Sequence, residues 1–216
     1  MTSPAEPSPA RRGWRAALAG RRGIAASELA LTAPVIGAVM LAGVDLVQFL
    51  RMQMRLETAV VQLGQAVSQC RQITTPGDTR GLWAIAQSAV GAGVNLTGGG
   101  SGGGAVILTG VRSVGGSNQI AWRERAGNTA YGGRVGTGVP GTAATLQAGF
   151  VVPAGQLALV TEIRAPVPPW PLSRLLAAAG VISTTLEATS IYLGRSADLT
   201  ALTAAPVSSE TAACLT

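Results

Sequence analysis

The sequence predicts an α+β fold, in which a long N-terminal transmembrane helix continues into a small extracytoplasmic domain with an antiparallel sheet. An apolar segment, a narrower apolar stripe after it, and short β-branched segments bounded by glycine or proline in the second half carry this prediction. We divide the 216 residues into a basic leader (1–23), a membrane segment (24–50), a helix extension (51–74), an α+β domain (75–200) and a C-terminal tail (201–216).

The membrane segment is long enough to cross a bilayer. A helix over residues 24–50 would extend about 40 Å at about 1.5 Å per residue, and the hydrocarbon core is about 30 Å thick. Five of the first 23 residues are arginines, whereas only Arg51 and Arg55 follow the segment closely. This excess predicts that the N-terminus stays cytoplasmic and that the rest lies outside the cytoplasm.

One acidic residue, Glu28, lies near the start of the apolar segment. A carboxylate in a membrane helix opposes insertion by roughly 2.5 to 3.5 kcal/mol at the helix centre and by less near an end, so such a residue suggests a function. The alternative is that Glu28 merely lies at the level of the cytoplasmic headgroups.

The residues around Glu28 resemble a known processing site. Gly23-Ile24-Ala25-Ala26-Ser27-Glu28 is similar to the site of type IV prepilins, where a dedicated peptidase cuts after glycine and glutamate is fifth in the mature chain. The continuation, with Pro34 and the stretch 43–46, resembles the TadE-like proteins, which are minor pilins or pseudopilins of tight-adherence (Tad/Flp, type IVb) pilus systems. The specific similarity covers residues 21–59, and a looser one covers residues 157–195.

The resemblance implies a minor pilin or pseudopilin, a structural and assembly subunit of a Tad-type pilus used in surface adhesion. A prepilin peptidase would cut between Gly23 and Ile24, and Glu28 would neutralise the new amine of a neighbouring subunit. Leu29 stands where the major Flp pilins favour an aromatic residue, which argues against the main filament subunit. The expected partners are the inner membrane of a bacterium, other pilin or pseudopilin subunits and the Tad assembly platform. The expected location is that membrane or the surface pilus.

A second function remains open. The chain could be an unprocessed single-pass envelope protein that acts as a periplasmic scaffold or binding module of a secretion or pilus apparatus. The glycine-rich stretch over residues 91–149 would then be a place for a partner-specific surface, as it would be in a pilin.

Apolar residues beyond the membrane segment predict that its helix continues to about Gln69. They recur at three- and four-residue spacings from Met52 to Cys70, with polar residues between them, which is typical of an amphipathic helix. We expect a turn at Thr75–Asp78 and a second helix through Val90, capped by Asp78 or Thr79 and closed by Gly91.

Four segments of the remaining chain have strand character, and we expect the sheet they form to pack on the C-terminal half of the long helix. A short helix is expected around Leu172–Ala179, and residues 97–104 and 125–149 are expected to be loops. The predicted strands are Ala105–Leu108, Asn118–Trp122, Leu157–Ile163 and Ile182–Leu193.

Two cysteines, Cys70 and Cys214, are present. In an exported domain they most simply form one disulfide. Two unpaired thiols and an intermolecular bridge are the alternatives. With no histidine in the chain, the sequence offers too few soft ligands for a metal site, and we expect no metal or other cofactor.

Composition argues against catalysis and against nucleic-acid binding. The chain contains neither histidine nor lysine, which excludes Ser-His-Asp, Cys-His and Ser-Lys mechanisms. Of Glu124, Glu162 and Glu187, the last two lie in neighbouring predicted strands, and we expect a solvated face or a pair with Arg164 or Arg195. The net charge of +6 is concentrated in the leader, so it suits anionic lipid rather than nucleic acid. We therefore expect no enzyme, no nucleic-acid partner and no small-molecule substrate.

Overall fold

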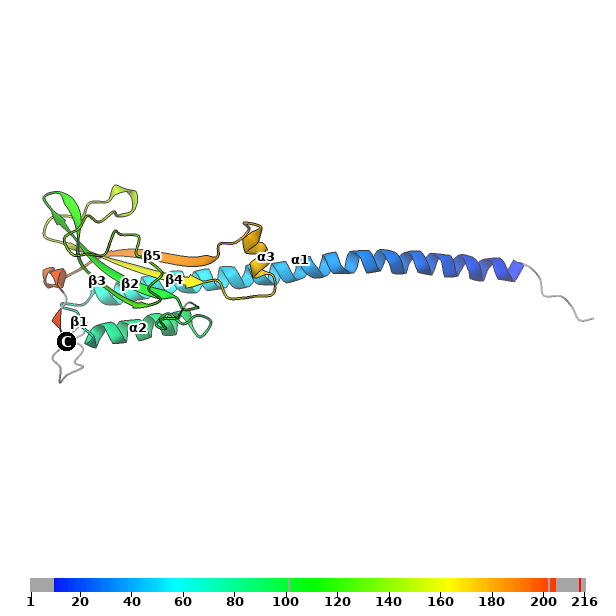
Figure 1. The fold of residues 1–216 in the computed structure, drawn as a ribbon, viewed down its shortest axis with the longest axis horizontal. Helices are drawn as coiled ribbons and strands as arrows, with labels where there is room; N and C mark the ends of the chain where they lie inside the picture. The colour runs from blue at the N-terminus through cyan, green and yellow to red at the C-terminus, as the bar shows by residue number, and fades with distance from the viewer. Residues whose placement is uncertain (1–9, 101, 202, 205–213, 215–216) are drawn as a thin grey trace, which may run out of the picture. The chain divides into compact units, whose positions relative to one another are not determined.

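The computed structural model describes residues 10–100, 102–201, 203–204 and 214 and confirms the α+β class. Helix α1 (Ala10–Ser68) is followed by a small domain with a four-stranded antiparallel sheet (Figure 1). The chain divides into two units, Met1–Leu46 and Val47–Thr216. Residues 1–9 of the predicted leader lie outside the described residues, and residues 10–23 are described by their backbone alone. In the predicted tail, the structure describes residues 201, 203–204 and 214.

Helix α1 ends at Ser68, one residue before the predicted end, but it begins at Ala10 rather than at Ile24. The leader is rich in alanine and arginine, which are good helix formers, and its scattered glycines do not interrupt the helix. Residues 10–23 of the leader and the membrane segment are therefore parts of one continuous helix.

The sheet has the strand order β3-β2-β4-β5. Its strands are β2 (Ala105–Val114), β3 (Ser117–Gly127), β4 (Leu157–Pro166) and β5 (Thr185–Leu193), and all three pairings are antiparallel. Strands β2 and β3 are longer than predicted because the two-residue turn Gly115-Gly116, with φ of 59° and 80°, joins them in a tight hairpin. A register shift at Gly110/Val111 interrupts the pairing of this hairpin.

One face of the sheet is covered by helix α2 (Gly77–Val90) and by residues 47–68 of α1. The buried cluster on this face joins Leu56, Leu63 and Val67 of α1 and Leu82 and Ala86 of α2 to the apolar side chains of the strands. Its strand members are Val106, Leu108, Trp122, Leu157, Leu159, Ile163, Ala165, Leu186 and Ala188. The sheet therefore packs on the C-terminal half of α1, as the periodicity predicts.

The opposite face of the sheet lies under the connection between β3 and β4. A second buried cluster joins Val111 and Val160 of the strands to Val135 and Leu146 of that connection. Except for the short 3₁₀ turn η1 (Gln147–Gly149), this connection has no helix or strand among its described residues, in agreement with the predicted loop.

Three smaller elements complete the fold. Helix α3 (Ser173–Ala178) lies between β4 and β5 where a short helix was predicted. The 3₁₀ turn η2 (Ala197–Thr200) follows β5, and β1 (Thr74–Thr75) pairs in parallel with β6 (Thr203–Ala204). No pairing between β1 and β6 was predicted, because two-residue strands leave no pattern in a sequence.

Candidate functional sites

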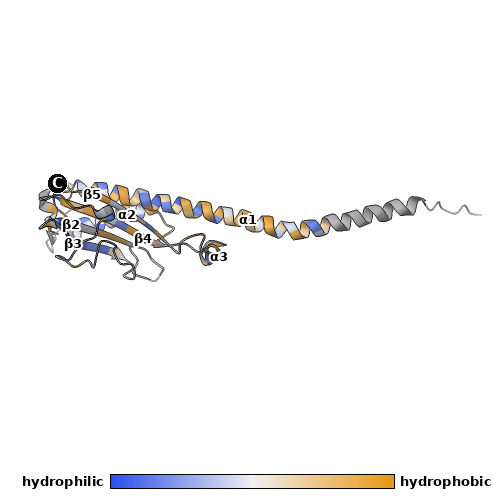
Figure 2. Ribbon diagram, turned by 90° about the horizontal axis from the view of Figure 1, so that it is seen from above, coloured by the Kyte–Doolittle hydropathy of each residue, from blue (hydrophilic) through white to orange (hydrophobic). Residues whose placement is uncertain are grey.

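Residues 26–50 of α1, which we call the first half of the helix, expose apolar side chains on all sides. Leu31 is 77% exposed, Met40 69% and Val39 67%, and Figure 2 shows how apolar residues dominate this part of the helix. Within Ala26–Ser68, the helix is long enough to span a membrane and contains an 18-residue window with a mean hydropathy of 2.0. An apolar surface of this extent on a water-exposed helix marks a site of membrane or protein contact.

Glu28 lies on this part of α1 and is exposed. The hydroxyl of Thr32 donates a hydrogen bond to the backbone carbonyl of Glu28 at 2.9 Å, so the carboxylate itself is not held by it. Gly23 and Ile24 belong to the same helix, and Ile24 is four residues, or about one turn, before Glu28. Asp45, the second acid of the segment, is buried.

A disulfide bond joins Cys70, just after α1, to Cys214 in the C-terminal tail, with the two Cα atoms 4.4 Å apart. It closes a loop over a sequence separation of 144 residues. In the chain-entropy model, a loop of this length stabilises the folded state by up to about 5 kcal/mol.

Asp78 supports the disulfide from helix α2. Its side chain is buried, and Oδ1 accepts a hydrogen bond of 3.1 Å from the backbone N–H of Cys214. Its Oδ2 accepts bonds of 2.8 Å from both the backbone N–H and the hydroxyl of Thr74. The predicted role of Asp78 or Thr79 as helix cap is therefore wrong: the helix follows Pro76, and Asp78 is inside its first turn.

Glu162 is buried on the loop-covered face of the sheet, which contradicts the predicted solvated face or arginine pair. Its Oε1 accepts a 2.8 Å bond from the backbone N–H of Arg134 in the covering loop. The sequence gives no sign of this burial, because the covering loop is glycine-rich and has no apolar period. Glu187, in contrast, pairs with Arg134 and with Arg164, the latter at 3.8 Å; Arg164 was one of the two predicted partners.

Arg123 ties the same loop to the sheet from β3. Its Nη1 donates to the carbonyl of Gly136 at 3.0 Å and its Nε donates to the hydroxyl of Thr109 at 3.0 Å. Burial lowers the pKa of the Arg123 guanidinium, the charge of Glu162 opposes this shift, and Arg125 adds to it. These contacts fix the loop over the sheet.

Gly133 passes close to both buried charges. A Cβ at this position would lie 2.9 Å from Nη2 of Arg123 and 3.0 Å from Oε2 of Glu162. Glu124, which we also considered for acid–base chemistry, lies on the other face of β3, and burial raises the pKa of its carboxyl group. The structure therefore places Glu124 apart from Glu162 and Glu187.

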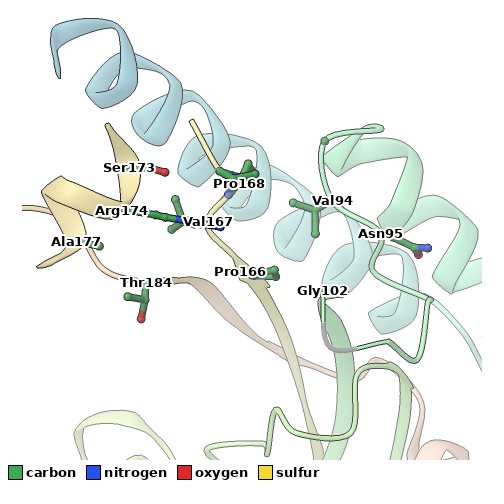
Figure 3. A pocket seen from close by; sticks show the side chains of 12 residues that line it. Val94, Asn95, Gly102, Pro166, Val167, Pro168, Ser173, Arg174, Ala177 and Thr184 are labelled. Atoms are coloured by element: carbon green, nitrogen blue, oxygen red, sulfur yellow. The ribbon is translucent and has the colours of Figure 1, made fainter. Parts of the chain in front are cut away.

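A pocket of about 410 Å³ lies where the chain leaves β4. Figure 3 shows α3, with Ser173, Arg174 and Ala177, on one side and the loop with Val94 and Asn95 on the other. Prolines form much of the wall between these two sides, and Arg174 contributes its charge. Among the described residues, no group of three or more histidine, cysteine, aspartate or glutamate side chains could hold a metal ion.

No protein-family model matches the chain, and no curated protein or solved structure is significantly similar to it.

Proposed function

We propose that this protein is a minor pilin or pseudopilin, a structural and assembly subunit of a Tad-type (type IVb) pilus that serves surface adhesion. The resemblance of residues 21–59 to the TadE-like proteins is the starting point of this proposal. The observation that carries it is the division of one unbroken helix into an exposed apolar half and a buried half that forms part of a domain core.

This division suits a subunit that moves from a membrane into a fibre. The exposed half needs an apolar environment, which lipid supplies before assembly and the helices of neighbouring subunits supply afterwards. The buried half keeps the α+β domain attached to that anchor throughout. Because the helix is continuous, no linker has to fold or unfold during the transfer.

Glu28 would connect processing with assembly, because its carboxylate would bind the amine that cleavage creates. Cleavage between Gly23 and Ile24 would leave a positive amine on Ile24 at the start of the mature helix. An ion pair between this amine and Glu28 of a neighbouring subunit would be formed only when both charges leave water together, since an unpaired buried ion is very costly. The carboxylate therefore specifies the register of assembly rather than adding stability.

The test replaces Glu28 by alanine and compares it with Glu57→Ala. Glu57 is an exposed glutamate of the same helix, whose carboxylate accepts a bond from Gln53. We expect Glu28→Ala to abolish incorporation into sheared surface fibres while cleavage after Gly23 continues, and Glu57→Ala to assemble normally. Fibres of wild-type abundance from Glu28→Ala would disprove the charge-pairing role.

The alternative is the unprocessed envelope scaffold. The observation that favours it is that α1 runs from Ala10 through Gly23 and Ile24 without interruption, as it would in a permanent anchor. Full-length protein that remains in the membrane fraction and never enters sheared fibres would support the scaffold and exclude the pilin.

A further inference from the structure

The connection between β4 and β5 is an apolar segment with an unusual composition. Residues 167–184, which we call the α3 excursion, contain Trp170, three prolines and a run of leucine and alanine. Arg174 is the single charged residue, and there is no acidic side chain. The segment is therefore apolar with a net positive charge.

Within unit Val47–Thr216, the excursion lies at the end where α1 enters the unit. Strand β5 runs alongside α1 in the same direction: Gln53 donates to the carbonyl of Glu187 at 2.9 Å, and Ser190 donates to the carbonyl of Val60 at 2.8 Å. At the far end, the backbone N–H of Arg195 donates to the carbonyl of Ser68.

The rise per residue sets the level at which the excursion begins. Thr185, paired with Pro166, is two residues before Glu187 in β5, about 7 Å further toward the helix entry. This distance corresponds to about four to five helical residues, since a helix rises about 1.5 Å per residue. The excursion therefore begins level with about Phe49, where the apolar segment of α1 ends and the first charged residue, Arg51, follows.

The excursion exposes its apolar side chains. Leu175 is 64% exposed and Val181 is 62% exposed, although Ile182 beside them is buried. At the same level, Val47 and Leu50 of α1 are also about half exposed. Trp170 is half-buried and packs against the core cluster, which holds the excursion in place.

We propose that the α3 excursion lies in the lipid–water interface of the membrane leaflet from which α1 emerges. Leu175 and Val181 insert between the acyl chains near the headgroups, and Arg174 binds lipid phosphate. Tryptophan and arginine beside exposed aliphatic side chains are typical of segments that lie in this interface. The inference rests on the membrane anchoring in the proposed function and is independent of cleavage and fibre assembly.

Lipid is favoured over a protein partner by position and by chemistry. The exposed aliphatic residues occur at the level where the apolar segment ends, which continues an apolar environment that α1 already requires. The α3 excursion itself offers Arg174 for anionic headgroups and contains no acidic side chain that they would repel.

The test is photocrosslinking of the full-length chain in its native membrane, with p-benzoylphenylalanine at position 175. The same probe at Ile36, in the exposed apolar half of α1, reports insertion of the anchor. Val114, 42% exposed at the β2–β3 hairpin, is the matched control, since β2 runs toward the end of the domain far from the excursion. We expect lipid adducts, identified by mass spectrometry, at 175 and 36 but not at 114.

The other outcomes are distinct. Lipid adducts at position 36 without any at 175, or adducts to protein at 175, would overturn the interfacial location and leave the anchor intact. No lipid adduct at either position would overturn the anchor and the interfacial location together. Equal lipid yields at 114 and 175 would mean that the probe does not report position, and this result would also reject the inference.

A second measurement, tryptophan fluorescence quenching, does not need p-benzoylphenylalanine. In vesicles with lipids brominated near the headgroup, the difference in fluorescence between wild type and Trp170→Phe isolates Trp170. We expect the brominated lipids to quench this difference signal. When the same difference is measured in the Leu175→Gln background, we expect no quenching, while the disulfide and the fold are retained. Equal quenching in Leu175→Gln would contradict an interfacial Leu175.

Discussion

Residues 26–50 and residues 51–68 of helix α1, its first and second halves, belong to one helix but differ in what surrounds their apolar side chains. In the second half, Leu56, Ala59, Leu63 and Val67 are completely buried under the sheet. In the first half, residues 26–50, the leucines and valines are between 43% and 77% exposed. The second half keeps charged side chains on its outer side, whereas the first half has apolar residues all round.

The difference teaches that the pattern of apolar residues, and not their number, determines what a helix segment needs. One sheet is enough to bury an apolar stripe at helical spacing, as in the second half. Apolar residues around the whole circumference cannot be covered by one domain, so the first half requires lipid or other helices.

The largest effect is expected where the buried half ends. Cys70→Ser removes the disulfide to Cys214, and such a loss typically lowers the free energy of unfolding by about 2–5 kcal/mol. Urea unfolding of the full chain in detergent measures it, with reduced wild type as the control. A change within about 0.5 kcal/mol, as for a neutral surface substitution, would show that the bond does not stabilise the domain.

The same substitution in the two halves tests the comparison directly. Leu63→Ala should lower the stability of the α+β domain by about 2–5 kcal/mol because it leaves a cavity in a fully buried site. Leu31→Ala, at a site 77% exposed, should change it by less than about 0.5 kcal/mol. Thermal unfolding followed by far-ultraviolet circular dichroism separates them, and equal losses would remove the distinction between the halves.

Helix glycines sharpen the comparison further. An added Cβ at Gly64 would lie 2.5 Å from Cδ2 of Tyr192, so Gly64→Ala should cost about 1–3 kcal/mol despite the better helix propensity of alanine. Gly37 has nothing within 4 Å of an added Cβ. Gly37→Ala should therefore leave the unfolding of the domain unchanged, and a loss equal to that of Gly64→Ala would contradict the difference in contacts.

The smallest expected effect concerns a single hydrogen bond between α1 and β5. Ser190→Ala removes the bond to the carbonyl of Val60 and should lower stability by about 0.5–1.5 kcal/mol. Ser183→Ala is the control, because Ser183 bonds only within its own exposed turn. Denaturant midpoints measure both variants, and an equal shift in the control would show that the contact between helix and strand adds nothing.

Local pattern predicted the helices and the strand positions. The spacing from Met52 to Cys70 gave the end of α1 within one residue, and β-branched segments located all four strands. The extent of the β2–β3 hairpin was missed although its signal, Gly115-Gly116 between short alternating segments, is present. Glycine pairs elsewhere in this glycine-rich chain made that signal hard to distinguish.

Contacts between distant residues could not be predicted in the same way. Asp78 was placed as a helix cap from its neighbours, but its partners include Cys214, which is 136 residues away. Glu162 lies in a strand whose pattern allows either face, and its burial depends on a loop that has no period of its own. The level of the α3 excursion follows from strand register, which the sequence leaves open.

The central claim is that α1 from Ile24 onward is the mature helix of a pilin-type subunit. N-terminal sequencing of the protein purified from its native membrane tests this claim most directly. The account predicts a chain that begins at Ile24, with Glu28 at its fifth residue. A chain that still begins at Met1 or Thr2 would contradict processing, and the scaffold would then be the better explanation of an unbroken helix.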